Sequence, residues 1–82
     1  MDKLLEEFSM GFRSAANDLR INKTLQNELE IEHHIQVYIQ FAVSENMWKA
    51  EAHSGNDLVY HGDARKIGDA IANAIDDLIV DR

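Results

Sequence analysis

The sequence predicts a small α+β domain of element order α-β-β-β-α, and two apolar patterns indicate it. Between Ile31 and Val43, apolar and polar residues alternate, which is the period of a strand with one buried side. Toward both ends of the chain, apolar residues recur every three or four positions, which is the period of an amphipathic helix. Each of these elements has to bury its apolar side. We therefore expect a three-stranded antiparallel meander with two helices packed on one face.

The first helix is expected to begin at Asp2 and to end near Arg20 or Ile21. After Arg20 the phase of the pattern slips, because Ile21 and Leu25 no longer continue the same apolar stripe. We expect the helix to end there, and a short helical turn or an irregular linker to lead through Asn27. The residues on the expected apolar stripe are Leu4, Leu5, Phe8, Phe12, Ala15, Ala16 and Leu19.

The middle of the chain predicts three strands. Residues 31–43 would span roughly 43 Å at about 3.3 Å per residue, which is too long for so small a domain. We therefore expect a bend or bulge near His33 and His34. Turn-forming residues precede Met47–His53, which alternates again, so the two segments predict a hairpin. A second turn leads to a short third strand at Leu58–His61.

The last helix carries its charges in an unusual order. Asp63 is expected to cap its N-terminus. Arg65 and Lys66 fall in the expected first turn, whereas aspartates crowd the last turns, which reverses the order that the helix macrodipole favours. The simplest explanation is that these charges lie on a solvent-exposed side of the helix, where their unfavourable interactions with the macrodipole are too small to matter. The functional interpretation is that the start of the helix contacts an anion, and that cations are contacted by Asp69, Asp76, Asp77 and Asp81.

Composition narrows the class of protein. The 82 residues fit a single domain, 1–82, and 45% of them are hydrophobic, as in globular chains. The N-terminus lacks the pattern of a secretory signal, and no apolar run approaches the about 18 residues of a membrane span. We therefore expect a cytoplasmic protein with no membrane partner. The net charge of −7 disfavours non-specific binding to nucleic acid and favours a basic partner.

No catalytic or metal-binding motif is present in the sequence, so we expect neither an enzyme nor a bound cofactor or metal. The chain has no cysteine, and its serines lie in no recognisable nucleophile motif. None of the familiar metal-ligand spacings occurs among its four histidines, which are His33, His34, His53 and His61.

The order of helix, three strands and helix resembles that of the double-stranded-RNA-binding domain. In that family a basic Lys-Lys-x-Ala-Lys cluster opens the last helix and contacts phosphates. Residues 65–69 here read Arg-Lys-Ile-Gly-Asp, which keeps two basic positions and reverses the charge at the third. The Gly-Pro-x-His loop of the family is missing. For bound RNA, the resemblance implies phosphate contacts from Arg65 and Lys66, with further contacts from Arg13, Arg20 and Lys23.

The leading functional hypothesis is a small acidic regulatory or inhibitory protein that docks on a basic surface of a larger protein. That partner could itself handle nucleic acid, as for accessory proteins of mobile elements. Tyr38 and Trp48 are candidate anchors wherever they are exposed. The alternatives are a nucleic-acid-binding module that uses Arg65 and Lys66, and a structural subunit such as a homodimer. A second candidate surface is the outer sheet face, with Glu32, His34, Gln36, Tyr38, Gln40, Lys49, Glu51 and His53.

Overall fold

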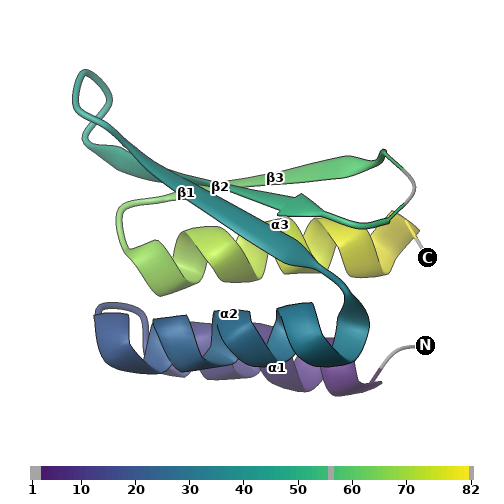
Figure 1. The fold of residues 1–82 in the computed structure, drawn as a ribbon. Helices are drawn as coiled ribbons and strands as arrows, with labels where there is room; N and C mark the ends of the chain where they lie inside the picture. Colours follow the sequence, from purple (N-terminus) through teal and green to yellow (C-terminus); the bar gives the residue numbers. More distant parts are fainter. Residues whose placement is uncertain (1–2, 56, 82) are drawn as a thin grey trace.

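The computed structural model describes residues 3–55 and 57–81 and confirms the α+β class. In these residues, three helices accompany one antiparallel sheet of order β1-β2-β3, which is the expected meander (Figure 1). A second helix, which the sequence did not predict, follows the first. The elements are α1 (Lys3–Ser14), α2 (Leu19–His33), β1 (Gln36–Ala42), β2 (Met47–His53), β3 (Val59–Ala64) and α3 (Ile67–Asp81).

The sheet has one apolar and one polar face, as its alternating pattern predicted. Across the strands, Ile39 lies opposite Ala50, and Ala50 lies opposite Gly62. In the next row, Ala52 lies opposite Tyr60, and both are buried. Small residues therefore occupy the middle of the inner face, and they let a helix approach the sheet closely.

The third strand continues beyond its expected end, so two predictions about the last helix were wrong. Asp63 does not cap that helix, because it lies within β3, at Val59–Ala64. Arg65 and Lys66 do not occupy the first helical turn, because α3 begins only at Ile67. The strand continues because its last inner-face positions, Gly62 and Ala64, are small and let β3 lie close over α3.

α3 is the middle layer of the molecule. One side of α3 packs on β2 and β3, and its other side packs on α1. α1 and α3 therefore lie on the same side of the sheet, but only α3 of these two packs on it directly (Figure 1). A Cβ at Gly68 would lie 2.6 Å from Cα of Ala16 and closer still to the carbonyl oxygen of Phe12, so this glycine permits the close approach of α3 to the end of α1 and to the turn after it. The buried residues of α3 are Ile67, Gly68, Ala70, Ile71, Ala72, Ala74, Ile75 and Leu78.

α2 occupies the segment that was expected to be a linker. Its N-cap is Asp18, whose carboxylate accepts hydrogen bonds from the N–H groups of Arg20 and Ile21 at 3.1 and 3.2 Å. The amide of buried Asn22 donates to the carbonyl oxygens of Ala15 and Asp18 at 2.7 and 2.8 Å and closes the turn between α1 and α2. The slip in apolar phase therefore marks the start of a new helix.

The end of α2 explains the change of direction that was expected at His33 and His34. His34 has a φ of 56°, and its N–H donates to the carbonyl oxygen of Glu30 at 3.1 Å, which is a left-handed helix cap. The first strand begins at Gln36 and not at Ile31. The prediction of a strand from Ile31 was wrong because residues 31–33 form the last turn of α2. α2 buries only one of its sides, and Ile31 lies on the exposed side.

Candidate functional site

The helices gather mostly acidic residues at one end of the molecule and mostly basic residues at the other. α2 and α3 end on the side where α1 begins (Figure 1). We call this side the acidic end. Acidic residues oppose the macrodipole at the C-terminal ends of both α2 and α3, although the first turn of α3 holds Asp69 and not Arg65 and Lys66. The acidic residues in the first turns of α1 and the last turns of α2 and α3 are Glu6, Glu7, Glu28, Glu30, Glu32, Asp76, Asp77 and Asp81.

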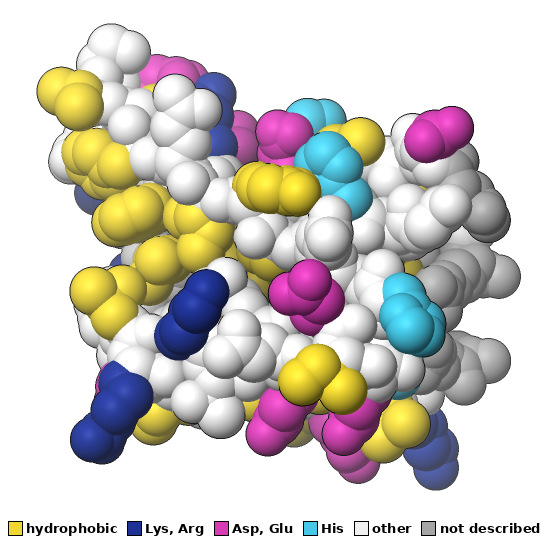
Figure 2. All heavy atoms as spheres, in the orientation of Figure 1, with side chains coloured by type: hydrophobic (Ala, Val, Ile, Leu, Met, Phe, Trp, Pro, Cys, Tyr) yellow, Lys and Arg dark blue, Asp and Glu magenta, His cyan; other side chains and the backbone are white. Residues whose placement is uncertain are grey.

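The opposite end carries basic side chains. A backbone hydrogen bond of 2.7 Å ties the start of α3 to the turn that precedes α2. Arg65 and Lys66, just before α3, therefore lie at the same end as Arg20 and Lys23 in the first turns of α2, and lysine and arginine side chains appear at this end in Figure 2. The structure thus brings four of the five residues of the RNA-binding alternative to one end. Arg13 is not among them.

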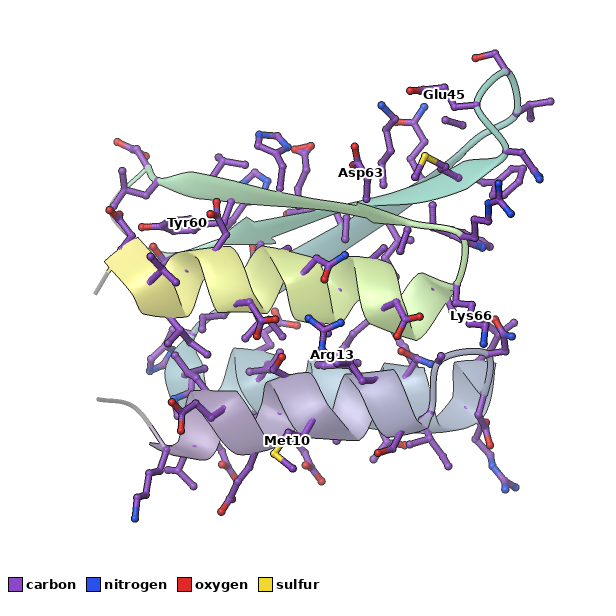
Figure 3. The ribbon with its side chains drawn as sticks, turned by 180° about the vertical axis from the view of Figure 1, so that it is seen from behind. Met10, Arg13, Glu45, Tyr60, Asp63 and Lys66 are labelled. Atoms are coloured by element: carbon purple, nitrogen blue, oxygen red, sulfur yellow. The ribbon has the colours of Figure 1, made fainter. Side chains whose placement is uncertain are left out.

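Arg13 and Asp76 connect α1 to α3. The Arg13 guanidinium pairs with the Asp76 carboxylate and donates a hydrogen bond of 2.9 Å to Oδ1 of Asn73. The Ser9 hydroxyl of α1 also donates to Asp76. Figure 3 shows Arg13 pointing from α1 toward α3. Asp76 was a candidate partner contact, and here its carboxylate already binds groups of the protein itself.

The other candidate aspartates of α3 lie at both ends of the helix. Asp81 accepts a hydrogen bond of 2.6 Å from the hydroxyl of Tyr60. Asp69 lies in the first turn of α3, eight positions before Asp77, which is about 12 Å along a helix. Asp77 is exposed, and its carboxylate makes no hydrogen bond or ion pair with another side chain of the described ranges. Asp77 and Asp81 are four positions apart and share one side of α3, whereas Asp69 lies two turns away.

The two aromatic candidates lie on opposite faces of the sheet. Tyr38 is 54% exposed on the outer face, where its hydroxyl donates to Gln36 at 3.0 Å and its ring packs edge-to-face on His53. Trp48 lies on the inner face, half-buried, and its ring packs edge-to-face on Phe41 with centroids 5.1 Å apart. Tyr38 is thus open to a partner, whereas Trp48 mainly packs within the hairpin.

The outer sheet face has a shallow hollow of about 480 Å³ in which charges of both signs compensate. The ammonium of Lys49 pairs with the carboxylate of Glu45 at 2.9 Å. This hydrogen bond and the attraction between the two charges raise the pKa of Lys49. Glu51 and Asp63 line the same hollow. The face therefore has no single sign of charge to attract a charged partner.

A groove between α1 and α2 combines negative charge with apolar surface, and we call it the acidic groove. It has a volume of about 260 Å³. Leu4 is 53% exposed, and Phe8 at the same groove packs edge-to-face on the ring of His33. The sequence did not reveal this groove because half of its lining comes from α2. Its lining residues are Leu4, Glu7, Phe8, Leu25, Glu28 and Glu32.

The glutamates of the acidic groove repel one another. Glu28 and Glu32 are four positions apart in α2, and like charges at this spacing destabilise a helix by about 0.2–0.5 kcal/mol. Their place near the C-terminus of α2 adds an unfavourable interaction with its macrodipole. Within residues 3–55 and 57–81, no ion pair or hydrogen bond engages the carboxylates of Glu7, Glu28 or Glu32. A cation in the groove would relieve this repulsion.

Another hollow, of about 630 Å³, lies where α2 passes into β1. Its lining includes His34 and His53 together with Glu30 and Asp57, which are residue types that can bind metals. In the part of the chain that the structure describes, no group of three or more such side chains is placed to hold a metal ion. None of the helices described is long and apolar enough to cross a membrane.

No known protein family, curated protein or solved structure matches this chain. The additional helix α2 also departs from the element order of the double-stranded-RNA-binding domain. The charge distribution and the acidic groove are therefore the features of this chain that indicate a function.

Proposed function

We propose that this chain is a small acidic binding protein that docks on a basic surface of a larger protein through the acidic groove. The observation that carries the proposal is the set of three glutamates around apolar side chains at the acidic end, whose carboxylates have no partner among the residues that the structure describes. Unpaired like charges cost stability, and a partner that supplies cations would recover it. The proposed surface differs from α3 alone, because Asp76 and Asp81 bind side chains of the protein itself.

The groove suits a lysine or arginine side chain of the partner. Such a side chain places its aliphatic stem against apolar surface while its charged head stays near carboxylates and water. Leu4 and Leu25 would contact the stem, and Glu28 and Glu32 would contact the head. The exposed carboxylate of Asp77 would add to the long-range attraction that speeds association. Occupying a basic surface in this way would exclude its ordinary anionic ligand, which is how a regulatory or inhibitory protein acts.

Nucleic-acid binding is the second candidate, and the basic end favours it. Arg20, Lys23, Arg65 and Lys66 lie at that end and are exposed. Four cations can contact phosphates without reading a sequence. The overall charge of −7 opposes this function.

Affinity capture from the native host tests both candidates. The bait proteins are the wild type, the groove variant Glu28→Lys/Glu32→Lys, and the control Glu51→Lys/Asp63→Lys, which changes the net charge equally on the outer sheet face without touching the groove. We expect the wild type and the control to retain a partner with a basic surface and the groove variant to lose it, because two attractive charges become repulsive. Retained proteins are identified by mass spectrometry, and circular dichroism verifies that each bait is folded.

The outcomes separate the two candidates. Equal retention of the same proteins by the groove variant would refute docking through the acidic groove. Retention that disappears after nuclease treatment and in an Arg65→Glu/Lys66→Glu bait, but persists in the groove variant, would establish the nucleic-acid candidate in its place.

A further inference from the structure

β1 is an open sheet edge without the features that usually prevent strands from pairing with other chains. It lies at one side of the sheet, with β2 as its only neighbour within the described ranges. Its sequence, Gln-Val-Tyr-Ile-Gln-Phe-Ala, has no charged residue and no proline. The other edge, β3, carries Asp63 and His61. Edge strands are normally protected by charges, prolines or bulges, because their free N–H and C=O groups can pair with another strand.

We propose that β1 pairs in antiparallel fashion with β1 of a second copy, across a two-fold axis at Ile39. In this register Ile39 faces its counterpart, Val37 faces Phe41, and Tyr38 faces Gln40 of the other copy. Inner-face residues then meet inner-face residues, because both members of each pair have the same parity. Phe41, which is 38% exposed in the single chain, gains an apolar neighbour. Two three-stranded sheets become one six-stranded sheet.

A face of α2 supports the same symmetry. Exposed residues of α2 spaced by three, four and seven positions share this face. The face adjoins the start of β1, because Glu30 and Ile31 line a hollow together with Gln36. Two antiparallel copies of α2 centred on Asn27 place Lys23 of one beside Glu30 and Ile31 of the other. Ile31 is 75% exposed in the single chain. The residues of the face are Arg20, Lys23, Asn27, Glu30, Ile31 and His34.

One axis can serve both elements. From His34, α2 reaches back seven residues to Asn27, which is about 10 Å. β1 runs back in the direction opposite to α2, and its residue Ile39 lies about 13 Å from Ile35 along the strand. The two centres therefore lie at nearly the same position along the molecule, on the side where β1 and α2 face the viewer in Figure 1. Figure 2 shows exposed hydrophobic side chains on this side.

The proposed dimer leaves the acidic groove open. Glu28 and Glu32 lie on the side of α2 that faces α1, away from the face centred on Asn27. Each copy also places the basic start of its α2 beside the acidic end of the other α2, so association reduces the repulsion between two chains of net charge −7. Pairing through β1 and docking through the groove are therefore separate properties.

Sedimentation equilibrium over a concentration series tests the β1 pairing. The wild type is expected to dimerise, and Tyr38→Lys/Gln40→Lys is expected to weaken the dimer at least about tenfold, because lysines then face lysines across the axis. The variant Tyr38→Lys/Gln40→Glu should dimerise again, since opposite charges then face each other in the proposed register. His61→Lys is the control, because it adds a charge to the same sheet face at the other edge.

A charge swap on α2 tests the shared axis. Lys23→Glu should weaken the dimer by placing glutamate beside Glu30 of the other copy, and Lys23→Glu/Glu30→Lys should restore it. Both sites are exposed, so the variants keep the fold, which circular dichroism verifies. A wild type that stays monomeric throughout the series would overturn the proposal. A dimer that is indifferent to the β1 variants, or is not rescued by the paired charges, would also overturn it.

Discussion

Replacing Gly62 by alanine tests the packing of α3 on the sheet, on which the placement of every helix depends. A Cβ at this position would lie 2.9 Å from Cβ of Asn73, and it would be closer still to the carbonyl oxygen of Ala70 and the amide nitrogen of Ala74. The last two atoms belong to the backbone of a helix that is buried on both sides. They cannot move aside without shifting α3 itself.

The expected cost follows from that geometry. Adding a methyl group to a well-packed interior typically costs about 1–3 kcal/mol, and backbone obstacles place this change at the upper end. A loss on the order of 3 kcal/mol lowers the melting temperature of a domain of this size by roughly 12–24 °C. It is also a large part of the roughly 4–12 kcal/mol that a chain of this length has in total.

Thermal unfolding followed by circular dichroism measures the effect. The matched control is Gly55→Ala, because a Cβ at Gly55 would have no atom within 4 Å, and its stability should change by less than about 0.5 kcal/mol. A Gly62→Ala protein that melts together with the Gly55→Ala control would refute the close packing of α3 on β3.

Two further predictions concern charged side chains. Asp76→Ala should lower the free energy of unfolding by about 1 kcal/mol in urea denaturation, because it loses the ion pair with Arg13 and the hydrogen bond from Ser9. The neighbouring Asp77→Ala should leave this free energy unchanged. Equal effects of the two substitutions would contradict the role of Asp76 in joining α1 to α3. Glu45→Gln should lower the pKa of Lys49 toward its ordinary value in an NMR titration, and an unchanged pKa would contradict the pairing. Because the folded pKa is raised, this pair stabilises the fold below the ordinary pKa of lysine and loses its effect as the pH rises through the raised value.

The sheet was predictable because its burial follows a period of two. The inner positions of β2 were expected at Trp48, Ala50 and Ala52, and the structure confirms this face and its pairing with β1. Tyr38 on the outer face is also confirmed as exposed. In these strands the alternating sequence pattern reflects only which face of the sheet is buried. The strands can therefore be predicted without knowing which helix covers that face.

α2 was missed because its apolar pattern is weak. It has only two fully buried positions, Asn22 and Leu29, and one of them is polar. Ile31 belongs to the helix and yet lies exposed, so it resembled the first residue of the strand. Packing of α2 against α1 and the capping by Asp18 decide the structure here, and neither is visible in the apolar period.

The candidate site was only partly accessible for the same reason. The reversed charges at the C-terminus of the last helix were visible in the sequence, and they do lie at the acidic end. The roles of Asp76 and Asp81 depend on Arg13 and Tyr60, which are distant in sequence and come close only in the folded chain. The acidic groove requires α2, so no interpretation without that helix could place Glu28 beside Glu7.

The central position of α3 also governs the order in which the protein can assemble. The helical pair and the sheet have little to pack against until α3 lies between them, and α3 is the last of the six elements to leave the ribosome. During synthesis the earlier segments would therefore stay exposed to chaperones and proteases until α3 emerges. A chain that stops at Lys66 should be degraded as an unfolded polypeptide, whereas a chain that includes α3 should fold in a single cooperative step.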